Sequence, residues 1–299
     1  MSSTKLPLPA PSANYYRNPR SFLEDLGPPI SRYPYDGIQQ VWSIWETELH
    51  RQQANVQDSE WVLFTGVDEE SFTRDFLNSP VKTISGSWNS YDKTSRLLLT
   101  RMPSSQAHEI AAHTFEHLLL KALEPMALDT KIKCMGSATC HGDGGSKRPD
   151  TQYQPKRLPR GRTTADWPTV VLEVAVSEPA SKLMSDVRYW LRQSDGAVQV
   201  VLTLRVDRRI PEVTLEKWER NEDHDNRRPH REQSITIRKR ATEVIEFRGD
   251  PLVIAFEKLF LRQPSAPREE DVRLGEEELR YLANSIWGVQ GFHVDEDEA

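Results

Sequence analysis

The sequence has little cysteine and no long apolar run. Cys134 and Cys140 are its only cysteines, which excludes a disulfide framework and makes a reducing compartment the expected one. The longest apolar stretch, near residues 118–120, is interrupted by Lys121 and Glu124, whereas a membrane helix needs ~20 apolar residues. The N-terminus lacks the apolar segment of a secretory signal. The sequence therefore predicts an intracellular protein, cytoplasmic or nuclear, that is not secreted and has no membrane partner.

Acidic residues outnumber basic ones in this chain. There are 45 Asp and Glu against 39 Lys and Arg, which gives a net charge of −6. This balance argues against a basic footprint for nucleic acid over the whole surface, although a local one remains compatible with it. The 37% of hydrophobic residues and the 28% of charged residues are typical of a globular body with polar tails and loops.

Proline and charge mark the two ends of the chain. Seven prolines fall within residues 1–35, and proline at that density blocks helices and sheet ladders. An acidic run occupies residues 295–298. The predicted organisation is a disordered Pro-rich tail at 1–35, a single globular domain at 36–263, and a C-terminal helix with an acidic tail at 264–299.

Hydrophobic spacing predicts the secondary structure. Helices are expected at 38–49, 72–77, 105–124, 181–194 and 276–287. Strands are expected at 61–64, 81–88, 95–102, 130–138, 148–154, 170–176, 198–206, 212–218 and 234–240, with a turn at 89–93, a loop at 142–145, and either a helix or a strand at 253–261. Ser104 or Ser105 is placed to cap the helix at 105–124. The strand–helix–strand run over 170–206 has an all-apolar centre and predicts a βαβ-like unit in an α/β (or α+β) fold.

Two acids stand out in the predicted strands. Asp150 follows Pro149 at the start of one strand, and Glu173 lies inside the apolar run at 170–176. Because burying an unpaired carboxylate costs several kcal/mol, Glu173 needs a partner, a metal ion or a shifted pKa. If the two strands pair, both acids converge and suit a Mg²⁺ ion, which prefers oxygen ligands. The alternatives are a turn or cap for Asp150 and a structural salt bridge from Glu173 to an arginine of 157–162.

Residues 105–206 resemble the PD-(D/E)xK superfamily of restriction-endonuclease-like phosphodiesterases. The order of a helix, a strand, the Pro149-Asp150 strand, the Glu173 strand, a helix and a strand carries this resemblance. A closer likeness is to a group of fungal proteins placed in that superfamily. The residues that carry it are Met102-Pro103 with His108-Glu109, the run at 173–178, and Leu183, Asp186, Trp190, Leu191, Ser194 and Gly196. The resemblance implies a mixed central sheet flanked by helices, with extra N-terminal and C-terminal elements.

The resemblance also implies a set of site residues. Asp150 and Glu173 would ligate a divalent metal such as Mg²⁺ and take part in phosphodiester hydrolysis. The leading helix often supplies one more acid in this superfamily. Glu109 or Glu116 stands in that helix, and Glu109 is closer to the fungal pattern.

The lysine of the superfamily motif is missing from its expected position, which falls on Ala175. The helix position that carries the lysine in some members falls on Asp186, so Lys182, one turn earlier, or Lys147 would have to position the attacking water. The leading hypothesis is a nuclease fold with a degenerate active site that binds nucleic acid or another macromolecule. An active Mg²⁺-dependent nuclease with a migrated lysine is the second hypothesis, and a non-catalytic protein-interaction module is the third.

A local cluster of basic residues surrounds the Pro149-Asp150 strand. Its members are Lys147, Arg148, Lys156, Arg157, Arg160 and Arg162. On an acidic protein, such a cluster beside a phosphate site favours backbone contacts to DNA or RNA. The alternative is a solvated basic loop. A second cluster at 227–240 is compatible with a nuclear-import signal or with charge that protects a strand edge.

Two zinc patterns are incomplete in this sequence. His108 and His113 lie five positions apart, whereas a zinc-protease helix needs two histidines four positions apart on one face. Cys134, Cys140 and His141 lack a fourth ligand at a usual spacing. We therefore expect the two cysteines to be free thiols.

Overall fold

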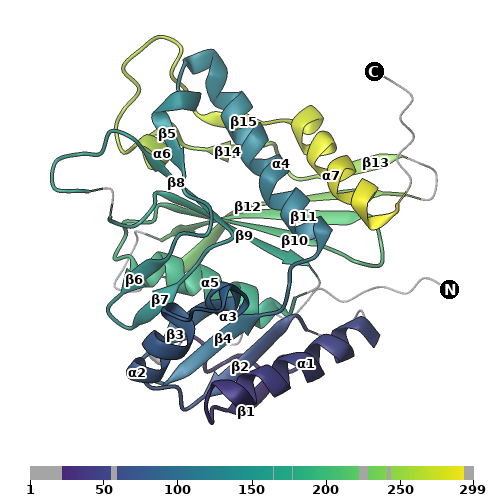
Figure 1. The fold of residues 1–299 in the computed structure, drawn as a ribbon. Coiled ribbons are helices and arrows are strands. Elements are labelled where there is room, and N and C mark those ends of the chain that lie inside the picture. Colours follow the sequence, from purple (N-terminus) through teal and green to yellow (C-terminus); the bar gives the residue numbers. More distant parts are fainter. Residues whose placement is uncertain are drawn as a thin grey trace.

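Two large β-sheets covered by helices make up the described part of the chain, which comprises residues 22–54, 59–163, 165–176, 178–221, 228–240 and 244–292 of this computed structural model. The six-stranded sheet lies in the lower half of Figure 1 and the seven-stranded sheet in the upper half. Both sheets contain parallel and antiparallel pairs. The predicted mixed α/β fold, with sheets flanked by helices, is confirmed.

The six-stranded sheet has the strand order β1-β2-β4-β3-β7-β6. Its strands are β1 (Ser31–Pro34), β2 (Trp61–Thr65), β3 (Trp88–Asp92), β4 (Leu97–Arg101), β6 (Cys140–Gly142) and β7 (Gly145–Lys147). Side chains alternate along β2, so Phe64 packs in the core beneath helix α1 (Ile38–Ala54), whereas Leu63 packs against residues 22–30 on the other face. Both faces of this sheet are therefore covered.

Three short helical segments lie beside β3. They are α2 (Glu69–Ser71), the π-helix η2 (Phe72–Leu77) and α3 (Lys82–Ser87). Phe72 stacks on Tyr91 of β3 with ring centroids 4.0 Å apart, and its edge meets Trp88. This aromatic group closes the core of the smaller sheet around the start of β3.

The seven-stranded sheet has the strand order β13-β12-β11-β10-β9-β8-β5. Its strands are β5 (Ile132–Cys134), β8 (Thr151–Pro155), β9 (Val170–Val176), β10 (Val200–Val206), β11 (Glu212–Arg220), β12 (Pro229–Lys239) and β13 (Ile245–Arg248). Helices α4 (Gln106–Leu123) and α7 (Glu276–Gln290) cover one face, and α5 (Ala180–Gln193) covers the other (Figure 1). Val174 faces the α4 side, so alternation turns Glu173 toward α5.

The predicted βαβ-like unit is present at the centre of this sheet. Strands β9 and β10 are parallel in register from Val170 beside Val200 onward, and α5 connects them. Helix α4 also matches its prediction, because the Ser105 hydroxyl accepts a hydrogen bond from the His108 amide at 3.3 Å and caps the first turn. Within the described residues, no helix combines the length and the apolar character that crossing a bilayer requires.

The C-terminal elements complete the larger core. They are the strands β14 (Leu252–Ile254) and β15 (Val272–Leu274), helix α6 (Phe256–Phe260) and α7. Two 3-10 turns, η3 (Glu124–Met126) and η4 (Asp129–Lys131), connect α4 to β5 of the seven-stranded sheet. The segment at 253–261, which the sequence left open between helix and strand, begins as β14 and ends as α6. Leu282 and Trp287 of α7 are buried in the same core as α4 and β9. The C-terminal helix is therefore part of the main body.

The sequence prediction was wrong around β3. The expected strand at 81–88 is mostly helix α3, and the expected turn at 89–93 lies mostly within β3. The chain turns later, at 93–96, because the Asp92 carboxylate accepts hydrogen bonds from the amides of Thr94 and Ser95 at 2.9 Å. The expected loop at 142–145 is present as the turn between β6 and β7, but these two short strands, which pair as a hairpin, were not predicted.

The boundary of the N-terminal tail was placed too late. Leu23, Leu26 and Ile30 are buried, and β1 pairs in parallel with β2 from Ser31 beside Val62. Proline is tolerated there because β1 is an edge strand of its sheet. The remainder of the predicted tail, residues 1–21, lies outside the described residues, as do the acidic run at 295–298, Ser177 and part of the second basic cluster.

Candidate functional site

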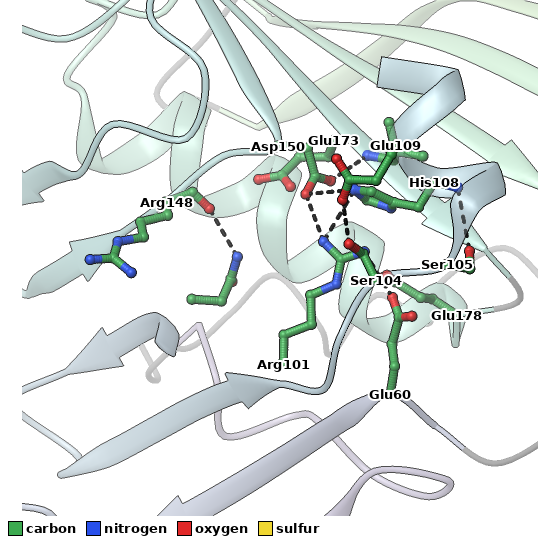
Figure 2. Close-up of polar contacts among 12 residues, drawn as sticks. Glu60, Arg101, Ser104, Ser105, His108, Glu109, Arg148, Asp150, Glu173 and Glu178 are labelled. Carbon is green, nitrogen blue, oxygen red and sulfur yellow. Dashed lines mark hydrogen bonds and ion pairs between the residues drawn. The ribbon is translucent and has the colours of Figure 1, made fainter. Parts of the chain in front are cut away.

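The pairing of β8 with β9 brings Asp150 and Glu173 together, as the sequence predicted. The strands are antiparallel with Thr151 beside Leu172, so Asp150, one residue earlier, lies next to Glu173. The Asp150 Oδ2 atom accepts a hydrogen bond from the Val174 amide at 2.7 Å. Figure 2 shows both carboxylates at the centre of a polar cluster.

Asp150 is held by two cationic groups. Its Oδ1 atom lies 2.9 Å from Arg101 Nη1 and 3.1 Å from His108 Nε2. The other side of the Arg101 guanidinium lies 3.1 Å from Glu60, which also faces Arg208. Burial alone would raise the pKa of Asp150, but His108 and Arg101 hold that pKa well below its usual range. Burial lowers the pKa of His108, but the charge and hydrogen bond of Asp150, together with the charge of Glu60, leave that pKa above its usual value.

Glu173 has a different set of partners. Its Oε1 atom lies 3.3 Å from Lys147 Nζ and accepts a hydrogen bond from Trp190 Nε1 at 2.5 Å. Lys147 Nζ also lies 2.8 Å from Asp186 Oδ1 and donates to the side chain of Asn89. Burial raises the pKa of Glu173 to about 8, because the attraction of Lys147 does not offset the lost solvation. The salt bridge predicted with an arginine of 157–162 is wrong: the partner is Lys147.

Lys182 forms an ion pair away from these two acids. Its amine lies 2.8 Å from Asp186 Oδ2 and 3.8 Å from Glu178 Oε2, and it sits 3.7 Å above the ring centroid of Trp61. The pair with Asp186 is the helical contact that the spacing of four residues predicts. Burial raises the pKa of Glu178 to about 7. No ion pair joins Lys182 to Asp150 or Glu173 within the part of the chain that the structure describes.

Two of the partners of the motif acids, Arg101 and Lys147, come from the other sheet. Arg101 ends β4 and Lys147 ends β7, and both strands belong to the six-stranded sheet. Asp150 directly precedes β8, and Glu173 lies within β9, so both belong with the seven-stranded sheet. The site is thus an ionic interface between the two sheets, formed where they meet.

A cleft of about 710 Å³ opens beside this cluster. Asp150, Arg101 and His108 line its wall, together with the helix acids Glu109 and Glu116. Glu173 and Lys147 do not line the cleft; they are 1% and 0% exposed and lie behind its wall. Only one of the two motif acids is therefore accessible from the cleft.

The acids of the leading helix line the same cleft but make contacts of their own. Glu109 is exposed, accepts a hydrogen bond from Ser104, and lies 4.0 Å from His113 one turn along the helix. Glu116 accepts a hydrogen bond from Thr151 at 3.3 Å. Neither carboxylate pairs with the groups around Asp150, so the predicted ligand role of Glu109 stays a prediction.

The residues at this position do not fit a divalent metal ion. Both oxygens of Asp150 are already taken, by Arg101 and His108 on one side and by the Val174 amide on the other. Glu173 Oε2 is the one carboxylate oxygen of the pair that lacks a hydrogen-bond partner, and it is buried. Across the described ranges, no group of three His, Cys, Asp or Glu side chains is arranged to hold a metal ion.

The predicted basic cluster separates into buried and exposed members. Lys147 is fully buried, so the prediction that it contacts nucleic acid is wrong. Its amine forms ion pairs with Glu173 and Asp186 instead. Arg148 stacks 3.8 Å from the ring centroid of Trp88 and donates to the Ser85 carbonyl at 2.7 Å.

The other four members of that cluster are partly or fully exposed. Arg162 is half-buried and donates to the carbonyls of Trp167 and Ala197. Lys156, Arg157 and Arg160 are exposed. Because these three side chains are exposed, their predicted contact with nucleic acid stays a prediction.

Arg101 and Glu60 were missed by the sequence reasoning. Arg101 ends the apolar strand β4, and Glu60 directly precedes the apolar strand β2. A charged residue at the end of an apolar run gives no sign in the sequence that its side chain is buried. Trp190 and His108 belong to the stretches that carry the fungal resemblance, so that likeness contained a signal for them. The two cysteines are free thiols as predicted, and burial raises the pKa of Cys134 to about 11 and that of Cys140 to about 12.

The fold and the site define a two-sheet α/β protein with a buried ionic interface. No protein-family model matches the chain, and no curated protein matches it. The chain is similar to a solved structure from Anabaena variabilis that is described as a "putative nuclease" belonging to DUF820. The matched region covers 65% of this chain and 90% of the Anabaena chain. The two sequences are 11% identical, and the TM-score is 0.36.

Proposed function

We propose that this chain is a nuclease-fold protein that binds nucleic acid without cutting it. One observation carries the proposal: Asp150 and Glu173 are paired with the chain's own Arg101, His108 and Lys147. A metal ion can polarise phosphate and activate water only where carboxylate oxygens are free to ligate it. Internal cations take that place here, so the fold is kept while the metal chemistry is lost.

The order of elements supports the nuclease-fold part of the proposal. Helix α4 is followed by β5 and, after β6 and β7 of the other sheet, by β8, β9, α5 and β10. Strands β5, β8, β9 and β10 lie side by side in that order within the seven-stranded sheet. Asp150 precedes the second of these strands and Glu173 lies in the third. Ala175, where the superfamily carries lysine, is apolar and 1% exposed. An alanine cannot position water or offset charge on a phosphate.

Thermal melting with and without Mg²⁺ or Mn²⁺ tests the loss of metal chemistry. A ligand that binds only the folded state raises the melting temperature, so we expect no metal-dependent rise for the natural chain. Incubation with plasmid, single-stranded DNA and RNA in the same buffers should leave all three uncut. Fluorescence anisotropy with labelled DNA and RNA should nevertheless show binding.

An active metal-dependent nuclease is the second candidate, because Lys147 Nζ lies 3.3 Å from Glu173 Oε1. That lysine would then replace the motif lysine, but at 0% exposure it has no access to an attacking water. This candidate predicts a Mn²⁺-dependent rise in melting temperature that Glu173→Gln abolishes, and cleavage that Asp150→Ala abolishes. Glu46→Gln, an exposed position of α1 that does not line the cleft, is the control. If Glu173→Gln loses the Mn²⁺-dependent rise and Asp150→Ala loses cleavage, the protein is a nuclease and the binding proposal is wrong.

A further inference from the structure

We propose that one edge of the seven-stranded sheet is a docking surface for the phosphate backbone of duplex nucleic acid, separate from the cleft. The surface, here called the edge patch, consists of Lys131, Lys133, Lys156, Arg157 and Arg160. It rests on the proposed function only in taking nucleic acid as the partner. It does not depend on the state of Asp150 or Glu173.

The strand register places three lysines of the edge patch together. Strand β5 is the last strand of its sheet and pairs with β8 alone. Lys133 stands opposite Gln154, and the Lys156 amide donates to the Lys131 carbonyl at 2.8 Å, so Lys131 stands opposite Lys156. Ile132 is buried beneath α4. By alternation, Lys131 and Lys133 project from the opposite face.

This face is distinct from the cleft. Cys134 shares the face of Ile132 and lines the cleft with Glu116. The Gln154 side chain, across from Lys133, donates to the carbonyl of Asp166 in the following loop. Arg157 and Arg160 lie on that loop, which extends to the left in Figure 1. The edge patch therefore continues from the β5–β8 edge onto the loop, away from α4.

The five cations of the edge patch lack counter-charges. Within the described residues, no carboxylate forms an ion pair with any of them, although the chain carries 45 acids and a net charge of −6. Some exposed arginines elsewhere are paired, such as Arg231, which lies 2.7 Å from Glu216 across β11 and β12. Like charges directly opposite each other on paired strands are destabilising. Keeping Lys131 opposite Lys156 thus costs stability, which an anionic partner would offset.

The surroundings of the patch favour a duplex backbone over other polyanions. The exposed large apolar side chains of the described residues are Val81, Val244, Tyr281 and Val289, and none belongs to the segments that form the patch. A membrane-surface site would present apolar side chains for insertion. A single-strand site would present aromatic rings for stacking on bases. Cations alone suit phosphates on a regular backbone, without sequence preference.

The test is fluorescence anisotropy with a labelled 20-base-pair DNA duplex over a series of salt concentrations. Five phosphate contacts give a slope of log K against log salt of about −4.5, at about −0.9 per contact. The triple variant K131E/K156E/R157E should weaken binding at least tenfold and reduce the slope to about −2. The matched control K93E/R209E/R248E changes the net charge equally at exposed positions outside the patch, with Arg248 on β13 at the opposite edge of the same sheet, and should bind as the natural chain does.

Four outcomes would overturn the docking surface. They are equal losses in both triple variants, tighter binding to the single strand than to the duplex, binding to phosphatidylserine vesicles but not to the duplex, and unchanged binding by K131E/K156E/R157E. In the last case the natural chain still binds duplex, so the proposed function survives while the patch fails. If the natural chain binds no nucleic acid at all, both fail, and the metal-melting result is unaffected.

A stability measurement separates docking from simple protection of the strand edge against aggregation. Lys131→Glu places an acid opposite Lys156 and should raise the melting temperature by about 1–2 °C, because it replaces a like-charge pair with an opposite-charge pair. The same substitution should weaken duplex binding severalfold. It keeps a charge at the edge, so unchanged binding with unchanged solubility would assign the lysines to edge protection alone.

Discussion

Asp150 and Glu173 are neighbours on paired strands, yet the protein treats the two acids in opposite ways. Asp150 has two cationic groups and a backbone amide on its oxygens, and its pKa is lowered. Glu173 shares its one cation, Lys147, with Asp186, and its pKa is raised. Burial disfavours ionisation of both acids. The number and sharing of partners therefore decide the direction of each shift.

This difference also bears on what the site can do. A nuclease site needs two acids that are ionised and open to the same metal ion. Here the ionised acid borders the cleft but has no oxygen to spare, whereas the acid with a spare oxygen is sealed behind the wall. Four substitutions test this contrast.

Removing Lys147 should have the largest effect. Lys147→Met leaves Glu173 and Asp186 without their shared cation in a fully buried position, and breaking such a pair typically costs about 3–5 kcal/mol. Chemical denaturation gives the free energy of unfolding. Lys156→Met, an exposed lysine, should change that free energy by less than about 0.5 kcal/mol. A loss below 1 kcal/mol for Lys147→Met would mean that Glu173 is neutral without Lys147.

Asp150→Asn should lower the free energy of unfolding by about 2–3 kcal/mol near neutral pH, because its hydrogen bonds are to charged groups. The folded-state pKa lies below the usual 3.8. The stabilisation by the carboxylate is therefore present at neutral pH and is lost as pH falls below about 4. Denaturation of both proteins between pH 7 and pH 3 should show their difference shrinking only at the acid end. Glu109→Gln is the control.

Glu173→Gln should give the opposite pH trend. The pKa of Glu173 is raised from its usual 4.5 to about 8, so protonation favours the folded state. The natural chain should gain about 1–3 kcal/mol relative to the variant as pH falls from 8 toward 5. The same denaturation series measures it. A constant difference over that range would show that Glu173 stays ionised beside Lys147.

Ser105→Ala should have the smallest effect and should act on the Asp150 side alone. Loss of the N-cap costs about 1 kcal/mol and loosens the first turn of α4, where His108 meets Asp150. The His108 ring resonances in a proton NMR titration should shift, while the Lys147 and Glu173 pair is undisturbed. Ser104→Ala, whose hydroxyl faces the exposed Glu109, is the matched control.

The sequence predicted the seven-stranded core well because apolar runs and helix caps there are local signals. The β9–α5–β10 unit and the capped helix α4 appear where expected. The strand pairing of Asp150 with Glu173 also followed from motif order. What failed was the smaller sheet around β3, where a helix replaced a predicted strand because buried aromatic contacts outweigh local propensity.

The partners of the two acids were beyond sequence reasoning for a different cause. Arg101 lies 49 residues before Asp150 in the chain, and no spacing rule links residues that far apart. Lys147 was named as a candidate, but as a surface contact or a water-positioning group. Its burial depends on where β7 adds to the other sheet, a long-range pairing that periodicity does not encode.

The route of the chain between the two sheets has a consequence for how the protein unfolds. The chain leaves the first sheet after β4, adds α4 and β5 to the second, returns to the first for β6 and β7, and then enters the second again at β8. Neither sheet can be cut out as a continuous fragment. We therefore expect one cooperative unfolding transition rather than two. We also expect slow folding, because strands that pair within one sheet are separated in the chain by elements of the other sheet.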